Sequence, residues 1–193
     1  MKSSSRSPLS APLFDEGIIL PLNKMVGVIG TAPAGGASIP CGEPGEHGGN
    51  MDNKRVTEGA AVYLPVNVPG ALLAMGDIHA VMADGEIGVS GLEIGGRITV
   101  RVELMKGNKK QVPLPVIFNE THVISVASDA DLDAACAQAV ANMSFYLTSH
   151  GFEQNEAAML ISLAGNVRIC QLVNPKKTAR VEMPLDIIKS KKL

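Results

Sequence analysis

Short apolar stretches of strand length, separated by turn residues, recur along the first two thirds of the chain and predict a series of β-strands. The clearest case is residues 97–104, where Ile98, Val100, Val102 and Leu104 lie on one face and polar residues on the other. This segment is predicted to be a half-solvated antiparallel strand. Further strands are predicted at 25–30, 60–68, 71–75, 79–82, 87–93, 111–118 and 122–127.

From Ser128 the apolar period changes from two to that of a helix. Ser128 to Asp131 is typical of a helix N-terminus, where acidic residues favour the helix dipole. A helix is predicted to run from there to His150, followed by a second helix at about 153–163. Two strands, 167–173 and 179–183, complete the pattern.

The chain is therefore predicted to be mainly β with a smaller α/β part at its end. Residues 1–12 are Ser- and Pro-rich and are predicted to be a disordered leader. Residues 13–127 form the β portion with the candidate site, and 128–193 form the α/β subdomain. Within the first portion, 31–50 is a long loop rich in Gly and Pro, and loops of this length are often functional.

Composition narrows the classes of function. The 193 residues are 46% hydrophobic and carry a net charge of −2, which supports a packed core and argues against nucleic acid as a partner. No uninterrupted apolar stretch reaches the ~20 residues of a spanning helix, so no membrane partner is expected. Three widely spaced cysteines fit neither a disulfide framework nor a zinc knuckle, which favours a cytoplasmic protein.

Candidate chemistry is concentrated between Gly48 and Glu86, where acids, an amide and an imidazole stand beside glycines. The side chains concerned are Asn50, Asp52, Asp77, His79, Asp84 and Glu86. The spacing alone gives only a weak indication of a metal or acid–base site.

The phrases around these residues resemble the acetamidase/formamidase family in wording, order and spacing. They include Gly-Glu-His-Gly-Gly-Asn-Met-Asp (45–52), Gly-Asp-Ile-His-Ala (76–80) and Asp-Gly-Glu (84–86), together with 25–34, 63–66 and 69–71. The similarity extends over roughly residues 20–185, nearly the whole chain.

This resemblance implies hydrolysis of a short linear amide, such as formamide or acetamide, to a carboxylate and ammonia. It also implies a CUB-like β-sandwich with a C-terminal α/β subdomain, in a cytoplasmic homo-oligomer. Family members are longer and carry an additional N-terminal section, so the sandwich is expected to be incomplete at its N-terminus. A partner chain supplying that section is one expectation. An inactive fragment or subunit that acts as an assembly or binding module is the alternative.

The resemblance also suggests roles for the candidate residues. Asp52 and His79 are expected to hold a divalent metal, with Glu86 as a third ligand or as the general base. Asp77 or Asp84 would orient Glu86, and the Asn50 amide would donate to the oxyanion. Zinc is favoured over calcium if His79 is a ligand, and no organic cofactor is expected.

Structural interpretations compete with these roles. Asp77 and Asp84 each adjoin a glycine, as turn residues do, and a lone His in an apolar run is often a core residue. Cys41 would permit thiolate catalysis, but its neighbour Glu43 would raise rather than lower the thiol pKa. His47 fits a surface loop. A calcium-binding β-sandwich is a further alternative if the site holds carboxylates without His79.

Overall fold

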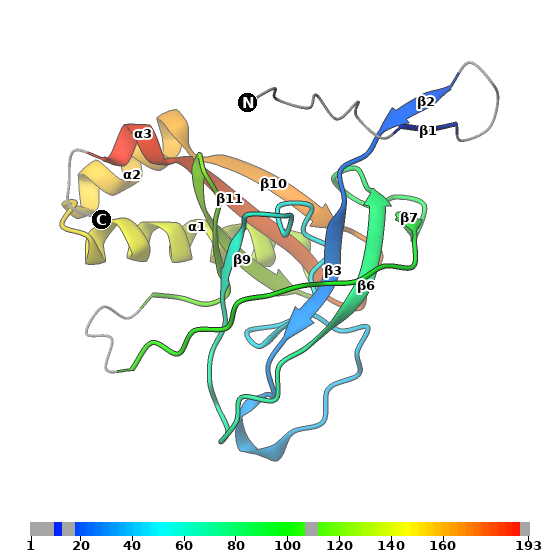
Figure 1. Cartoon of the computed structure of the whole chain (residues 1–193). Coiled ribbons are helices and arrows are strands. Elements are labelled where there is room, and N and C mark those ends of the chain that lie inside the picture. Colours follow the sequence, from blue (N-terminus) through cyan, green and yellow to red (C-terminus); the bar gives the residue numbers. More distant parts are fainter. Residues whose placement is uncertain (1–9, 13–17, 107–111, 190–193) are drawn as a thin grey trace, which may run out of the picture.

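The computed structural model describes residues 10–12, 18–106 and 112–189, and the fold is mainly β, as predicted (Figure 1). The strands are β1 (Ser10–Pro12), β2 (Ile19–Pro21), β3 (Met25–Gly30), β4 (Gly48–Asn50), β5 (Ala61–Tyr63), β6 (Ala74–Val81), β7 (Leu92–Glu93), β8 (Val116–Phe118), β9 (His122–Asp129), β10 (Asn166–Gln171) and β11 (Lys177–Pro184). The helices are α1 (Leu132–Ser149), α2 (Gln154–Ala164), α3 (Leu185–Ile188) and a short 3-10 turn at Ala34–Gly36.

The larger sheet has five antiparallel strands in the order β10-β11-β9-β8-β5, and α1 and α2 cover one of its faces. Val123 and Val181 project from this face into a core shared with Met143 and Leu147 of α1. The predicted helix start is confirmed, since Asp131 accepts a hydrogen bond from the Ala134 amide. Among the described helices, none combines the length and apolar character needed to cross a membrane.

The smaller sheet, in the order β4-β3-β6-β7, packs on the opposite face of the larger one. Alternate residues of a strand point to opposite faces, so Ile124 and Val126 of β9 face away from α1. They join a second apolar cluster with Ile29 of β3 and Met51, which follows β4. The molecule therefore has three layers, two sheets and a layer of helices.

The predicted division at residue 128 falls inside β9, in the middle of a continuous sheet. β9 pairs along its whole length with β11, from His122 opposite Pro184 to Asp129 opposite Lys177. β5 and β8, from the first predicted portion, belong to this same sheet. In the predicted leader, Ser10–Pro12 pair with β2, and residues 1–9 lie outside the described part.

Several strand predictions differ from the structure, and the strands predicted at 60–68 and 111–118 are shortened to β5 and β8. Residues 97–104 have no regular secondary structure. The alternating pattern shows which face of the segment is apolar, but a strand also needs a neighbouring strand for its backbone hydrogen bonds. The two strands predicted around Gly76 and Asp77 are one continuous strand, β6. The strand predicted at 87–93 is reduced to β7, because turns occupy the residues before it.

Candidate metal and acid–base site

Asp52, His79 and Glu86, predicted as a metal-binding set, come together in the structure. His79 lies in β6, Asp52 follows β4, and Glu86 lies in the turn after β6. Their exposed fractions are 1%, 1% and 7%, and one potential ligand atom from each lies within 4.8 Å of the others. Carboxylates so deeply buried are rare unless they serve a partner or a function.

The backbone is strained where this cluster forms. Asp52, Asp77 and Glu86 have φ angles of 44°, 59° and 45°, a region that residues other than Gly seldom occupy. Strain of this kind is concentrated at functional sites, where it aims side chains that relaxed backbone would direct elsewhere. Gly27 of β3 leaves the necessary space, since an added Cβ would lie 2.5 Å from Asp52 Oδ1 and 2.6 Å from Asp77 Oδ2.

The His79 ring is fixed by two carboxylates at its Nε2 atom. Asp77 Oδ1 lies 3.2 Å and Glu93 Oε1 3.0 Å from Nε2. Glu93 of β7 is the cross-strand neighbour of His79, so antiparallel pairing brings it there. The other ring nitrogen, Nδ1, is buried and has no hydrogen-bond partner in the described part of the chain.

Burial and mutual repulsion shift the titration of the two buried acids. Burial raises the pKa of Glu86 to about 7, and the negative charge of Asp52 adds to the shift. Burial also raises the pKa of Asp52, an effect that a hydrogen bond from Asn174 opposes. Two carboxylates in such a place do not readily ionise together, so a proton or a cation is needed to neutralise the pair.

Asn174 supports Asp52 from the other side of the fold. Its Nδ2 atom donates to Asp52 Oδ2 at 2.9 Å and to the Asn50 carbonyl at 3.2 Å. Asp52 Oδ1 is buried and receives no hydrogen bond from the described residues. The sequence analysis missed Asn174 and Glu93. Asn174 belongs to a turn far along the chain, and the only sign for Glu93 was its place in a predicted strand.

The remaining predicted residues stand at different distances from the cluster. Asp77 is partly exposed and contacts His79 directly. Asn50 donates weakly to the Gly42 carbonyl at 3.5 Å, and its buried Oδ1 has no described partner. Asp84 binds Arg180 at 2.8 Å and Lys54 at 3.1 Å, so its carboxylate anchors the turn rather than orienting Glu86.

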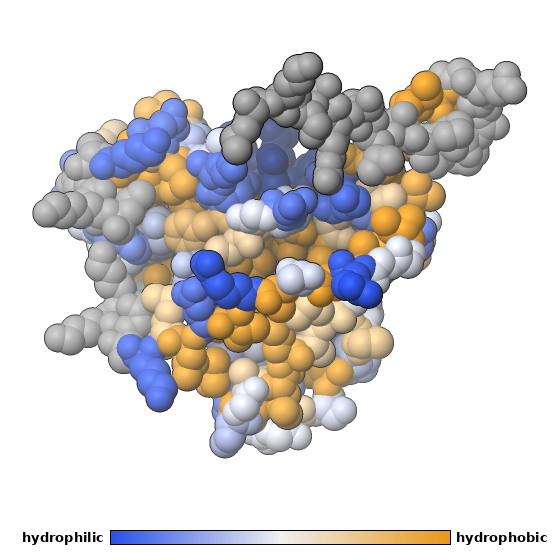
Figure 2. All heavy atoms as spheres, in the orientation of Figure 1, coloured by the Kyte–Doolittle hydropathy of each residue, from blue (hydrophilic) through white to orange (hydrophobic). Residues whose placement is uncertain are grey.

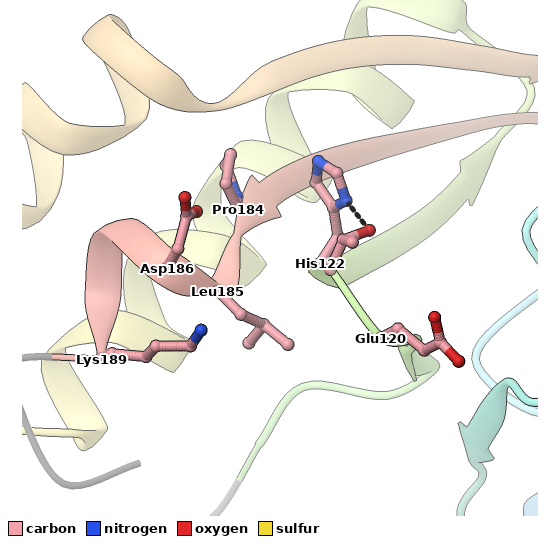
Figure 3. Close-up of a pocket in the computed structure, with 7 residues that line it drawn as sticks. Glu120, His122, Pro184, Leu185, Asp186 and Lys189 are labelled. Atoms are coloured by element: carbon pink, nitrogen blue, oxygen red, sulfur yellow. Dashed lines mark hydrogen bonds between the residues drawn. The ribbon is translucent and has the colours of Figure 1, made fainter.

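Two described cavities lie apart from the cluster. One of about 220 Å³ contains Cys41 and His47, but none of the three buried cluster residues lines it. A larger one of about 380 Å³ lies between α3 and the start of β9 (Figure 3). There His122 Nδ1 contacts the Thr121 hydroxyl at 2.7 Å, while Asp186 and Lys189 stand on the opposite side.

The layered fold and this cluster define a mainly β protein with a buried carboxylate–imidazole centre, suited to hold a metal ion or to transfer protons. The sequence pattern of the Acetamidase/Formamidase family matches residues 31–190. The chain belongs to this family, as the resemblance predicted.

Solved structures agree with this assignment. The chain is 45% identical to an acetamidase from Bacillus halodurans, with a TM-score of 0.83, over 94% of this chain and 61% of that one. It is also 45% identical to a predicted acetamidase/formamidase from Thermoanaerobacter tengcongensis, with a TM-score of 0.87, over 93% and 59%.

A curated relative shows the same pattern of coverage. A formamidase from Methylophilus methylotrophus is 32% identical over 152 residues, which are 69% of this chain and 37% of that protein. The chain therefore spans less than two thirds of the length of each of these three relatives.

Proposed function

We propose that this protein hydrolyses a short linear amide, of the formamide or acetamide type, to a carboxylate and ammonia. The observation that supports it is the buried cluster of Asp52, His79 and Glu86, in a chain that belongs to the acetamidase/formamidase family. Two relatives are named an acetamidase and a formamidase, and these names support short linear amides as the substrate class.

Amide hydrolysis needs an activated water, stabilisation of the oxyanion and a proton for the leaving nitrogen. Glu86 accepts a proton from the water as its oxygen bonds to the carbonyl carbon. Glu86 then returns that proton to the nitrogen as the carbon–nitrogen bond breaks and ammonia leaves. The Asn50 amide donates a hydrogen bond to the carbonyl oxygen as negative charge develops on it, while Asp77 and Glu93 orient the His79 ring beside the reacting groups.

A divalent metal fits the same residues. One of their polar atoms, Asp52 Oδ1, is buried and has no hydrogen-bond partner among the described residues, as expected of an atom that binds a cation. Asp52, His79 and Glu86 would hold the ion, and an imidazole beside carboxylates favours zinc over calcium. A bound zinc ion supplies Lewis-acid polarisation of the carbonyl and a lower pKa for water.

Ammonia release from formamide and acetamide tests the activity. The His79→Ala variant is expected to lose roughly 10²–10⁴-fold in rate, because the imidazole touches the reacting groups. His122→Ala, which changes a histidine outside the cluster, is the matched control and is expected to keep its rate. A folded wild-type protein that releases no ammonia contradicts the proposal.

Elemental analysis tests the metal separately. Zinc is expected to accompany the purified protein in a ratio near one per chain and to be lost in the Asp52→Asn variant. A metal-free wild-type protein that still hydrolyses amides would remove the metal from the proposal and leave the acid–base roles in place.

The alternative that the sequence analysis named, an inactive fragment or subunit of the same fold acting as an assembly or binding module, is not favoured by the comparisons. A folded but inactive chain that gains amidase activity when combined with a further polypeptide would support it. Homo-oligomerisation and a cytoplasmic location remain predictions of the sequence resemblance.

A further inference from the structure

Arg180 of β11 is a buried cation on the face of the larger sheet that points away from α1, as does its cross-strand neighbour Val126. Figure 2 shows hydrophilic residues spread over the surface of the molecule, where charged side chains are usually found, whereas Arg180 is 0% exposed. We infer that Arg180 is a positioning residue that fixes the separation of Asp52 and Glu86. This inference rests on the proposed function, in which both acids belong to the site.

The turn that carries Glu86 is held by β10 and β11, whose hairpin reaches the smaller sheet in Figure 1. Arg180 Nη1 lies 2.8 Å from Asp84 Oδ1, and Nη2 donates to Oδ2 at 3.0 Å. The planar guanidinium therefore faces both oxygens of this carboxylate. The Gly85 amide donates to the Cys170 carbonyl at 3.0 Å. The two residues before Glu86 are thus fixed, one by its side chain and one by its backbone.

The segment that carries Asp52 is held by the same guanidinium through one further carboxylate. Arg180 Nε donates to Glu182 Oε1 at 2.7 Å. The Glu182 carboxylate also accepts two hydrogen bonds from Arg55, at 2.8 and 2.7 Å. Arg55 stands only three positions after Asp52. Arg180 is therefore the group at which the supports of the two acids meet.

Lys54 joins the two segments a second time, because its Nζ atom lies 3.1 Å from Asp84 Oδ2. The network thus connects both acid-bearing segments to β11 and to each other. Stability alone is a weak reason for burying such a network, since the desolvation of buried charges costs about as much free energy as their attraction returns. The geometry of the site is a stronger reason, because the position of a reacting group has large effects on rate.

Arg180→Lys tests this inference in amide hydrolysis. The variant keeps the positive charge but replaces the planar fork with a single ammonium group, which cannot hold Asp84 and Glu182 in the same geometry. We expect kcat for ammonia release to fall roughly 10–100-fold with little change in KM, because displacement of a reacting group by about 1 Å has effects of this size. Arg168→Lys is the matched control, since Arg168 is the exposed cross-strand neighbour of Arg180 on β10. It is expected to leave both constants unchanged.

Hydrogen exchange measures the displacement of the turn without reference to activity. The Gly85 amide donates to the Cys170 carbonyl, and the Leu172 amide donates to the Gly85 carbonyl at 3.1 Å. In Arg180→Lys these two amides are expected to exchange faster by a larger factor than the amides of β9. Acceleration by the same factor in both places, or in β9 alone, would show a general loss of stability and overturn the inference.

A double-mutant cycle with Asp84→Asn completes the test. Both substitutions interrupt the same link, so the loss of kcat in the double variant is expected to be smaller than the product of the two single losses. A loss equal to that product would overturn the inference, as would wild-type kcat in Arg180→Lys. A wild-type protein that releases no ammonia, while exchange at Gly85 responds as expected, would contradict the proposed function and still support Arg180 as the residue that positions the turn.

Discussion

At the scale of single residues, the site is built by groups that are each unfavourable alone. Two buried acids repel each other, and both lie on backbone with positive φ. The fold maintains them through contacts from distant parts of the chain, above all the Asn174 amide on Asp52. Groups that orient a ligand in this way commonly matter almost as much as the ligand.

The Asn174→Ala variant tests this support. Loss of the hydrogen bond removes an influence that lowers the pKa of Asp52, so the carboxylate becomes harder to ionise and less well placed. The expected result is a fall of roughly 10–100-fold in amide hydrolysis or zinc affinity, with the fold preserved. Asn166→Ala is the control, because the Asn166 side chain is exposed and only contacts the Ala164 carbonyl. Equal effects of the two substitutions would contradict the role.

Some residues of the candidate site could be predicted from the sequence and others could not. The clustering of Asp52, His79 and Glu86 was predictable because each lies in a phrase that resembles the family, within three residues of a glycine. Asn174 was not, since 122 positions separate it from Asp52 and only the pairing of β10 with β11 places its turn at the site. The contact between Asp84 and Arg180 could not be predicted either, because 96 positions separate the two residues; the orienting role of Asp84 stays a prediction.

At the scale of elements, regular periodicity predicted a strand correctly where the described structure provides a neighbouring strand. The pattern at 122–127 became β9, which has β8 and β11 on its two sides. The equally regular pattern at 97–104 did not become a strand. The period of the apolar residues shows which side chains of a segment are suited to burial. A strand also needs a neighbouring strand with which its backbone amides and carbonyls form hydrogen bonds.

Strand β11 carries a buried ion-pair network whose contribution to stability depends on pH. Glu182 accepts two hydrogen bonds from Arg55, at 2.8 and 2.7 Å, and one from Arg180 at 2.7 Å. Burial alone would raise the pKa of Glu182, but these two guanidinium groups outweigh it and lower the pKa to about 2.

The folded state therefore binds fewer protons at Glu182 than the unfolded state between about pH 2 and pH 4.5. The stabilisation is complete above that window and is lost as pH falls through it. In Glu182→Gln this dependence, on the order of 3 kcal/mol, should disappear from the free energy of unfolding. Denaturant unfolding from pH 2.5 to 7 measures it, with Glu103→Gln on the exposed segment as the control. An unchanged pH slope in Glu182→Gln would contradict the assignment.

At the scale of the whole molecule, we expect the two sheets and the helices to unfold as one cooperative structure. The larger sheet has an apolar cluster on each face, so neither layer can detach without exposing it. Polar contacts also join the layers, including Asn174 to Asp52 and Arg55 to Glu182. A division at residue 128 would have to break β9 away from β11, with which it pairs from His122 to Asp129.

Ile124 provides the test, because its side chain is fully buried in the apolar cluster between the two sheets. Ile124→Ala is expected to lower the free energy of unfolding by about 2–5 kcal/mol through loss of buried methyl groups and the cavity left behind. Hydrogen exchange should accelerate by the same factor in β6 and in β10, since one global opening governs both. Ile19→Ala, at a position 61% exposed, should change neither. Faster exchange in β6 with β10 unaffected would instead show two independent units divided as the sequence predicts.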